Sequence, residues 1–234
     1  MSGLEDAGDV RAQLVGGEGW HGGSGRSGGW PELWMFQGRS VSKPLRWGLR
    51  STSNLSDARG CGMAYYDLVE TPLGPMFVGG SGDGVHRIDF ITDRRDEAHY
   101  VERLERDSRE PVERDPEAAR VAVEAVRAYF AGDESAWDGL PPLAARGTEF
   151  QAAVWHELMA IPRGATVSYG EIAMAIGRPS AARAVGRAVG TNPLAVVVPC
   201  HRVVGSNGAI TGYASGLDRK RWLLAHEHVE LALN

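Results

Sequence analysis

The patterned part of the chain begins at Met63 and first predicts a small sheet. Three short segments rich in Tyr, Val, Phe and Ile indicate strands, at 64–70, 76–79 and 85–91. Turn sequences containing Gly, Pro and Asp separate these segments, as expected between consecutive strands. A highly charged stretch, 93–113, follows the third segment.

The next pattern is that of an amphipathic helix at 115–131. Its apolar residues recur on the faces of a helix. Pro116 lies near the first turn and Gly132 ends the helix, the positions that these two residue types favour. The strands and this helix together make 63–146 a small α+β domain, and a Pro- and Gly-containing linker closes it.

From residue 147 onward the pattern becomes helical. Capping boxes at 148–151 and 168–171 open two helices, which extend to about 160 and 176. A third, Ala-rich helix at 181–189 follows after a short turn that contains Gly. Helix, short turn and helix form the outline of a helix-turn-helix motif. Its second helix presents Arg183 and Arg187, four residues apart on one face.

Residues 1–62 differ from the rest of the chain. They contain 14 of the 31 glycines and four of the seven tryptophans, and neither a helical nor a strand period runs through them. The Gly/Ser-rich segment 16–29 is typical of flexible chain. Two interpretations compete: a disordered extension with a role of its own, or an upstream over-read with Met63 as the true start. We favour the second, because a clean strand signal follows Met63 at once.

Composition is that of an ordinary soluble protein, with 43% hydrophobic and 24% charged residues. No apolar run could span a membrane, and we see no secretory signal. The only cysteines, Cys61 and Cys200, exclude a disulfide scaffold and a Cys-rich zinc site and fit a cytoplasmic location. The net charge of −5 is uneven: residues 63–146 carry −8 and residues 147–234 carry +2. The helix-turn-helix lies in the basic part, which permits nucleic acid as a partner.

Cys200 is the candidate for covalent chemistry. It follows an apolar run at 194–198 that predicts a buried strand, and it precedes His201 and an arginine. A cysteine after such a strand is often only a small buried hydrophobe. A strand end with a base and a positive charge nearby favours a reactive thiolate instead. Neighbours on a strand point to opposite faces, so contact with His201 needs a turn or a bridging water. Glu227 and Glu230 are candidates for a carboxylate that orients the imidazole.

Several ordered motifs resemble those of the O6-alkylguanine-DNA alkyltransferase family, the methylated-DNA–protein-cysteine methyltransferases. They are Pro-Cys-His-Arg-Val at 199–203, Ala-Ala-Arg-Ala-Val-Gly at 181–186, Val-Ser-Tyr-Gly-Glu at 167–171, Asn-Pro at 192–193, Gly-Tyr-Ala-Ser-Gly-Leu at 212–217 and Leu-Leu-Ala-His-Glu at 223–227. The match in the first domain is weaker and rests mainly on the strand pattern and on Thr-Pro-Leu-Gly at 71–74. The resemblance implies an α/β protein in which a ribonuclease-H-like scaffold domain, 63–146, precedes a helical, winged-helix-like domain, 147–234.

The resemblance implies a DNA repair protein that acts once. Cys200 would take the alkyl group from O6-methylguanine and keep it irreversibly as a thioether, which makes the enzyme a stoichiometric methyltransferase. By similarity His201 takes the thiol proton through a water, Glu227 orients the imidazole and Asn192 holds the turn that carries the cysteine. Whether O4-methylthymine is a second substrate stays open.

The alkylated oxygen lies inside the base stack, so the resemblance also implies that the nucleotide is flipped out of the duplex. Arg183 would fill the gap from a helix in the minor groove, and Tyr169 would contact the base and its 3′ phosphate. Gly170 and Ser206 are further candidate DNA contacts. Three more residues would line the base pocket together with Tyr169, and they are Val203, Tyr213 and Ser215.

No cofactor is implied, and the seven histidines show no spacing of metal ligands. The expected partner is double-stranded DNA that contains an alkylated guanine. We expect the protein to be a monomer and to have no membrane partner. The alternative within the family is a non-catalytic binder of alkylated DNA, but such a protein would lack Cys200. A helix-turn-helix regulator would favour one DNA sequence. A cysteine hydrolase would need an oxyanion hole, to which nothing in the sequence points.

Overall fold

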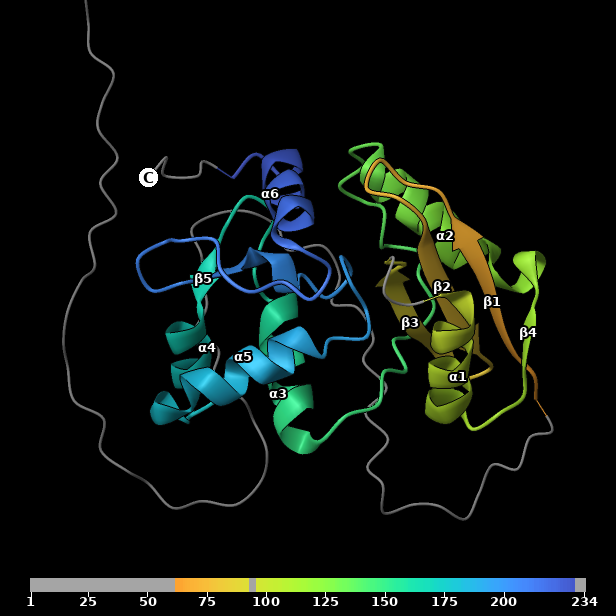
Figure 1. Cartoon of the computed structure of the whole chain (residues 1–234), viewed down its shortest axis with the longest axis horizontal. Coiled ribbons are helices and arrows are strands. Elements are labelled where there is room, and N and C mark those ends of the chain that lie inside the picture. The colour runs from red at the N-terminus through yellow and green to blue at the C-terminus, as the bar shows by residue number, and fades with distance from the viewer. Residues whose placement is uncertain (1–61, 93–95, 230–234) are drawn as a thin grey trace, which may run out of the picture. The chain divides into compact units, whose positions relative to one another are not determined.

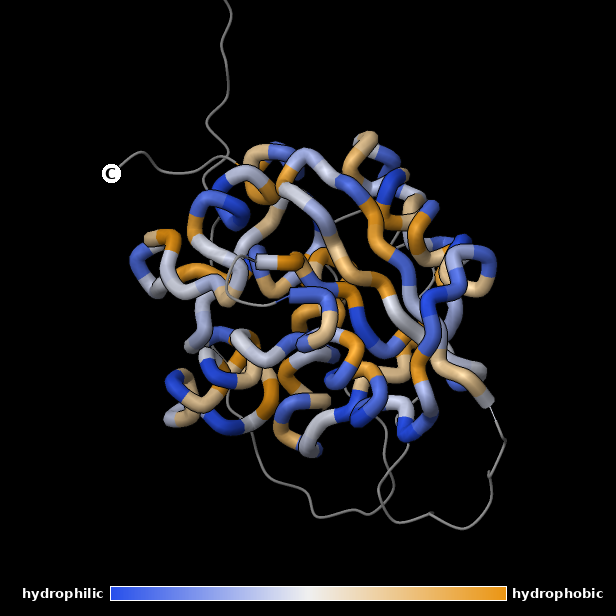
Figure 2. Tube along the Cα trace, turned by 45° about the vertical axis from the view of Figure 1, so that its right-hand side comes forward, coloured by the Kyte–Doolittle hydropathy of each residue, from blue (hydrophilic) through white to orange (hydrophobic). Residues whose placement is uncertain are grey.

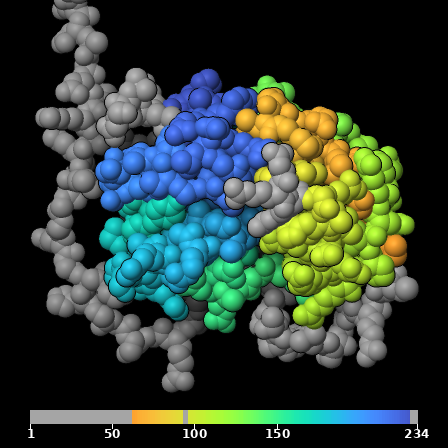
Figure 3. All heavy atoms as spheres, in the orientation of Figure 1, coloured from red at the N-terminus to blue at the C-terminus, as the bar shows by residue number. Residues whose placement is uncertain are grey.

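The computed structural model of this chain describes residues 62–92 and 96–229. The predictions for residues 1–61 therefore lie outside the described residues. A sheet domain is followed by a helical domain (Figure 1). On the face drawn in Figure 3 the atoms of these two parts meet along one seam. None of the helices described is long and apolar enough to cross a membrane.

A four-stranded sheet forms the centre of the first domain. Its strands are β1 (Ala64–Val69), β2 (Met76–Ser81), β3 (Gly84–Phe90) and β4 (Val112–Arg114), in the spatial order β3-β2-β1-β4. The first three pair antiparallel, whereas β4 lies parallel to β1. The three strands predicted from the sequence are thus confirmed, because turns rich in Gly and Pro separate them clearly.

Two helices cover opposite faces of this sheet, α1 (Glu97–Ser108) and α2 (Pro116–Phe130). Leu104 of α1 shares a buried cluster with Phe77, whereas Val78 belongs to the larger cluster that contains α2. Adjacent residues of a strand point to opposite faces, so β2 supports both helices. Figure 2 shows several hydrophobic stretches in the middle of the folded region.

The helical pattern predicted α2 but did not reveal α1 within the charged stretch. The buried residues of α1 are Tyr100, Leu104 and Ser108, one for each turn of helix. This stripe is too narrow to stand out among so many charges. The helix begins at a side-chain cap, since Asp96 accepts a hydrogen bond from the His99 amide at 3.1 Å.

Four helices make up most of the second domain. They are α3 (Glu149–Met159), α4 (Tyr169–Ala175), α5 (Ala182–Gly190) and α6 (Leu217–His226), and two short parallel strands, β5 (Val167–Ser168) and β6 (Val203–Val204), lie beside them. Both predicted capping boxes form, one between Thr148 and Gln151 and one between Ser168 and Glu171. A 3₁₀ turn, Pro179–Ala181, joins α4 to α5. The helix-turn-helix outline is therefore present.

The prediction of a strand at 194–198 is wrong, because this segment is a buried turn in which Val196 has a φ of 73°. An apolar run of five residues indicates burial but cannot distinguish a strand from other buried backbone. The turn is joined to the outer edge of β3. The Ile88 amide donates to the Pro193 carbonyl at 2.9 Å, and the Ala195 amide donates to the Ile88 carbonyl at 2.7 Å. The first domain thus anchors the backbone that leads to Cys200.

Candidate active site

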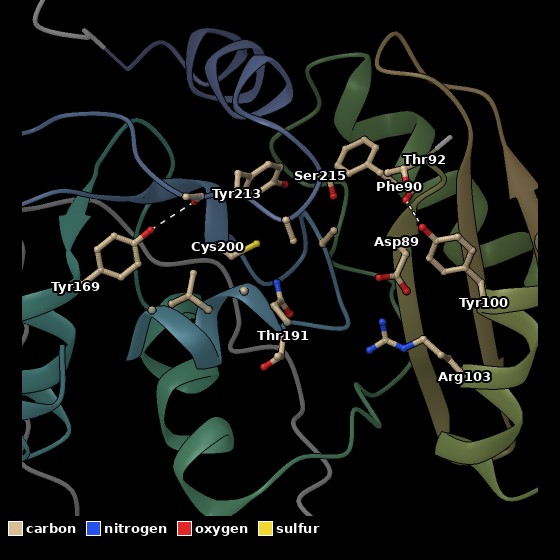
Figure 4. Close-up of a pocket in the computed structure, with 17 residues that line it drawn as sticks. Asp89, Phe90, Thr92, Tyr100, Arg103, Tyr169, Thr191, Cys200, Tyr213 and Ser215 are labelled. Atoms are coloured by element: carbon tan, nitrogen blue, oxygen red, sulfur yellow. Dashed lines mark hydrogen bonds between the residues drawn. The ribbon is translucent and has the colours of Figure 1, made fainter. Parts of the chain in front are cut away.

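Cys200 begins a 3₁₀ turn, Cys200–Arg202, directly after the buried turn. Its side chain is only 7% exposed and lines a pocket of about 430 Å³. Figure 4 shows the sulfur pointing into this pocket. Because the backbone here is a turn and not a strand, Cys200 and His201 are not forced onto opposite faces. Contact between Cys200 and His201 was expected to need a turn or a bridging water, and the backbone here is a turn.

His201 lies next to Glu227 in a fully buried pair. The Nε2 atom of His201 is 3.0 Å from Oε1 of Glu227, and the two residues are 0% and 1% exposed. Glu227 follows the last residue of α6, a position where a carboxylate usually faces water. The other ring nitrogen of His201, Nδ1, is buried and has no hydrogen-bond partner within residues 62–92 and 96–229. With Nε2 engaged by the carboxylate, Nδ1 is the atom that can accept a proton.

Two further donors hold Glu227, and sequence reasoning did not place either there. Arg202 donates from Nε to Oε2 at 2.7 Å and from Nη2 to Oε1 at 2.8 Å. The Tyr129 hydroxyl, at the end of α2 in the first domain, donates to Oε1 at 2.6 Å. We expected the arginine after His201 to stabilise the thiolate, whereas its guanidinium binds this carboxylate. No local signal in the sequence links Tyr129 to a residue 98 positions away.

Burial and charge set the protonation states of this cluster in opposite directions. Burial alone would raise the pKa of Glu227, but hydrogen bonds from Arg202 and His201 hold that pKa well below its usual range. Burial lowers the pKa of His201 despite the carboxylate beside it. Burial also raises the pKa of the Cys200 thiol. At neutral pH the cluster therefore combines a protonated thiol, a neutral imidazole and an ionised carboxylate, which is the state a general base requires.

Asn192 fastens the turn that precedes Cys200. Its Nδ2 atom donates to the Val198 carbonyl at 2.8 Å, and its Oδ1 atom accepts from the Leu194 amide at 3.0 Å. One amide side chain thus bridges both ends of the buried turn. It satisfies backbone groups that strand pairing would have satisfied if 194–198 were the predicted strand. Asn192 also lines the pocket.

Lys220 is a buried cation near Cys200 that the sequence analysis did not single out. Its Nζ atom, from the first turns of α6, donates to the carbonyls of Val203 at 2.5 Å and Thr211 at 2.7 Å. Burial lowers the pKa of Lys220 to about 8, and the nearby Cys200 opposes this shift. The same charge lowers the pKa of the Cys200 thiol and so partly offsets the effect of burial.

The pocket has walls from both domains (Figure 4). Tyr169, Tyr213 and Ser215, which the sequence predicts beside the base, line this pocket, whereas Val203, predicted with them, lies in β6 with no exposure and is not part of its wall. Burial, followed by the nearness of Cys200, raises the pKa of Tyr213 well above its usual value. The sequence analysis did not expect the wall from the first domain, which consists of Asp89, Phe90, Thr92, Tyr100 and Arg103.

Three of the four candidate DNA contacts, Arg183, Gly170 and Ser206, do not line this pocket. Arg183 is exposed on α5, and Ser206 is exposed in the loop after β6. Tyr169 begins α4, where its hydroxyl donates to the carbonyls of Thr211 at 3.2 Å and Gly212 at 3.4 Å. Gly170 follows it and is partly buried. Tyr169 is therefore the one member of this group that also reaches the pocket of Cys200.

The second domain combines a helix-turn-helix with Cys200 and the His201–Glu227 pair, and comparison with known families identifies the class of protein that has this two-domain fold. Residues 64–142 match the model described as 6-O-methylguanine DNA methyltransferase, ribonuclease-like domain. Residues 149–229 match the model described as 6-O-methylguanine DNA methyltransferase, DNA binding domain. The chain belongs to the 6-O-methylguanine DNA methyltransferase family. The resemblance and the two-domain fold class predicted from the sequence are thereby confirmed.

Individual relatives cover most of the chain. A methylated-DNA–protein-cysteine methyltransferase of Methanosarcina acetivorans is 44% identical over 163 residues, which are 70% of this chain and 97% of the relative. The protein of that name from Mycobacterium tuberculosis is 45% identical over 165 residues, 70% of this chain and 93% of the relative. The crystal structure of Mycobacterium tuberculosis OGT in complex with DNA matches with a TM-score of 0.58 and 40% identity, covering 70% of this chain and 92% of that one. As a member of this family, the chain is a DNA repair methyltransferase that binds DNA.

Proposed function

We propose that this chain repairs O6-methylguanine in double-stranded DNA by moving the methyl group to its own Cys200, once per molecule. The observation that carries this proposal is the cluster at the pocket, where Cys200 adjoins the buried pair His201–Glu227. An activated nucleophile needs a base and a group that orients the base, and His201 and Glu227 are the residues that we propose for these roles. The family match supplies the substrate class.

The chemical step balances within the site and the substrate. His201 takes the proton of the Cys200 thiol, through a bridging water, and Glu227 with its ionised carboxylate stabilises the imidazolium that forms. The sulfur then forms a bond to the methyl carbon while the bond between that carbon and O6 breaks. The electron pair stays with the guanine, which takes up one proton in place of the one that left the thiol. The product is a thioether on Cys200, which cellular thiols do not reverse.

The alkylated base has to leave the duplex to reach the pocket. Flipping costs roughly a few kcal/mol, and a protein group that fills the gap offsets part of this cost. Arg183 is exposed on α5, a helix rich in Ala and Gly that suits close approach to a groove. Tyr169 lies between this surface and the pocket, and Gly170 and Ser206 complete the proposed DNA contacts. Tyr213 and Ser215 are the proposed walls beside the alkyl group.

The partner is therefore DNA with an alkylated guanine, and we propose that the protein acts as a monomer in the reducing cytoplasm. Support for the location comes from Cys200, which is a free thiol. The alternative of a non-catalytic binder is disfavoured because such a binder would lack the acceptor cysteine, whereas this chain has Cys200 followed by His201. The regulator and hydrolase alternatives leave the family match without an explanation.

Intact mass after mixing with a duplex that carries one O6-methylguanine tests the proposal. We expect one added methyl group, on the peptide that contains Cys200 and not on the one that contains Cys61, with equimolar loss of the lesion. Cys200→Ala should still bind the lesion but accept no methyl group. Tight binding without any mass change in the natural chain would support the non-catalytic alternative. Methyl transfer to the Cys200→Ala protein would refute the assignment of the acceptor.

A further inference from the structure

Arg219, in the first turn of α6, connects three separate segments of the chain through backbone carbonyls. Its Nε atom donates to Leu73 at 3.0 Å, Nη1 donates to Ser215 at 3.1 Å and Nη2 donates to Ile91 at 3.3 Å. Leu73 and Ile91 belong to the first domain, whereas Ser215 belongs to the second. A single side chain thus joins the two domains with all three guanidinium nitrogens.

In the first domain Arg219 binds backbone that is itself held by hydrogen bonds. Leu73 lies in the turn before β2, where the Thr71 hydroxyl donates to the Gly74 carbonyl at 2.6 Å and accepts from the Leu73 amide at 3.2 Å. Ile91 follows β3 directly, and its amide donates to the Pro75 carbonyl at 2.9 Å. The guanidinium also lies over the Phe90 ring, 5.2 Å from its centre. The Phe90 ring belongs to β3, and the two acceptors lie in the turn before β2 and directly after β3, so all three are next to the sheet.

The contact in the second domain is made to a wall of the pocket. Ser215 and Phe90 both line the cavity that contains Cys200, on opposite domains (Figure 4). Ser215 ends the connection between β6 and α6, and the glycine after it is an N-cap without a side-chain hydrogen bond. Lys220 and Tyr169 hold Thr211 and Gly212, earlier in this connection. Arg219 is the side chain that binds the carbonyl of Ser215 itself.

The choice of arginine fits this geometry. A guanidinium presents five N–H donors in a rigid planar fork, so its three nitrogens can bind acceptors that lie well apart. The single nitrogen of an ammonium holds its acceptors around one point, as Lys220 does with the carbonyls of Val203, Thr211 and Gly212. Across the described ranges Arg219 forms no ion pair with a carboxylate, and its hydrogen bonds go to three backbone carbonyls. The side chain is therefore placed to fix backbone positions and not to neutralise a charge.

We propose that Arg219 is a positioning residue through which the first domain fixes the pocket wall at Ser215 and so limits the size of the alkyl group. The inference rests on the proposed function and extends it to substrate range. When the three hydrogen bonds are removed, the wall at Ser215 can move away from Phe90. Larger alkyl groups then fit better relative to methyl. A methyl group loses its close contact with the wall at Ser215, whereas a larger group no longer clashes with that wall.

The test compares second-order transfer rates on two duplexes that differ only in O6-methylguanine or O6-benzylguanine. Arg219→Met removes the donors but keeps an unbranched side chain over Phe90, and Arg219→Lys keeps the charge without the fork. Arg221→Met is the matched control, since Arg221 lies on the same helix, has a side chain that is 54% exposed and pairs with Asp218 three residues away. Thermal unfolding of each variant is measured in parallel.

We expect the benzyl-to-methyl rate ratio to rise about tenfold in Arg219→Met, the low end of what one group in an apolar pocket discriminates. The ratio should rise less in Arg219→Lys and stay unchanged in Arg221→Met. A merely structural role slows both substrates alike, since unfolded molecules react with neither, and an unchanged ratio therefore overturns the inference. If Arg219→Met does not fold, the ratio of the Arg219→Lys protein decides. Absence of transfer in the natural chain would overturn the proposed function itself.

Discussion

The hydroxyl of Tyr129 provides a direct test of the coupling between the first domain and the Cys200 cluster. Tyr129→Phe removes one oxygen and leaves the ring in its place, where it stacks with Trp137 at 5.4 Å. The lost interaction is the 2.6 Å hydrogen bond to Glu227, between two residues that are almost fully buried. His201 and Arg202 still donate to Glu227, so its carboxylate stays ionised and is not left without a partner.

The expected loss follows from the charge and the burial of the acceptor. A hydrogen bond to a charged group contributes about 1.5–3 kcal/mol to the free energy of unfolding. For a folded region of this size each kcal/mol changes the melting temperature by about 2–4 °C. Tyr129→Phe should therefore lower the melting temperature by roughly 3–12 °C. Methyl transfer at saturating substrate should persist, because the nucleophile and its base remain in place.

The chain offers a matched control at its surface. The Tyr66 hydroxyl donates to Glu97 at the same distance, 2.6 Å, but the pair is only partly buried. A partly buried interaction of this kind contributes less than the buried one, because water competes for both groups. Differential scanning calorimetry at pH 7 on the natural chain, Tyr129→Phe and Tyr66→Phe measures both effects. Equal melting temperatures for the two variants, or no loss in Tyr129→Phe, would refute the argument that burial makes this hydrogen bond strong.

Three further outcomes are expected. Arg183→Ala should slow repair of O6-methylguanine in duplex DNA by about tenfold or more but leave the reaction with free O6-benzylguanine almost unchanged, because only the duplex requires base flipping; equal slowing of both would argue against a flipping role. Lys220→Met should raise the pKa of the Cys200 thiol, since the Lys220 charge lowers it, and a titration of thiolate absorbance that shows a lower pKa would contradict this. Burial lowers the pKa of both His201 and His86, so both imidazoles are neutral in the folded state while unfolded imidazoles bind protons below about pH 6.5. The free energy of unfolding should therefore fall between pH 7.5 and pH 5.5; a urea midpoint that stays constant or rises on acidification would show that these groups do not control the stability in this range.

Much of the fold was predictable because its signals are local. The capping boxes at 148–151 and 168–171 predict where two helices begin, since the donor and acceptor of each box lie three residues apart. The Pro- and Gly-containing turns separate β1, β2 and β3 in the same way. The sequence did not reveal α1, whose apolar stripe has one residue per turn, or the buried turn at 194–198, whose Val-rich run indicates burial alone.

The candidate site likewise has features that the sequence predicts and features that it does not. The candidate nucleophile, base and carboxylate could be proposed from the motifs around Cys200, His201 and Glu227, because those motifs identify the family. Their protonation states could not, since the pKa shifts arise from burial and from donors that the chain brings from elsewhere. A glutamate at a helix end is an ordinary solvated residue until Arg202 and Tyr129 surround it.

The sequence by itself thus determined the family, the helices with capping boxes, the first three strands and the identity of the acceptor candidate. Only the tertiary structure decided that Tyr129 binds Glu227 across 98 residues, that Lys220 lies near the thiol and that Arg219 joins Leu73 to Ser215 across the pocket. The physical reason is range. Caps, turns and periodicity act within a few residues and leave a trace in the order of amino acids, whereas burial and long-range hydrogen bonds depend on which surfaces meet when the chain has folded.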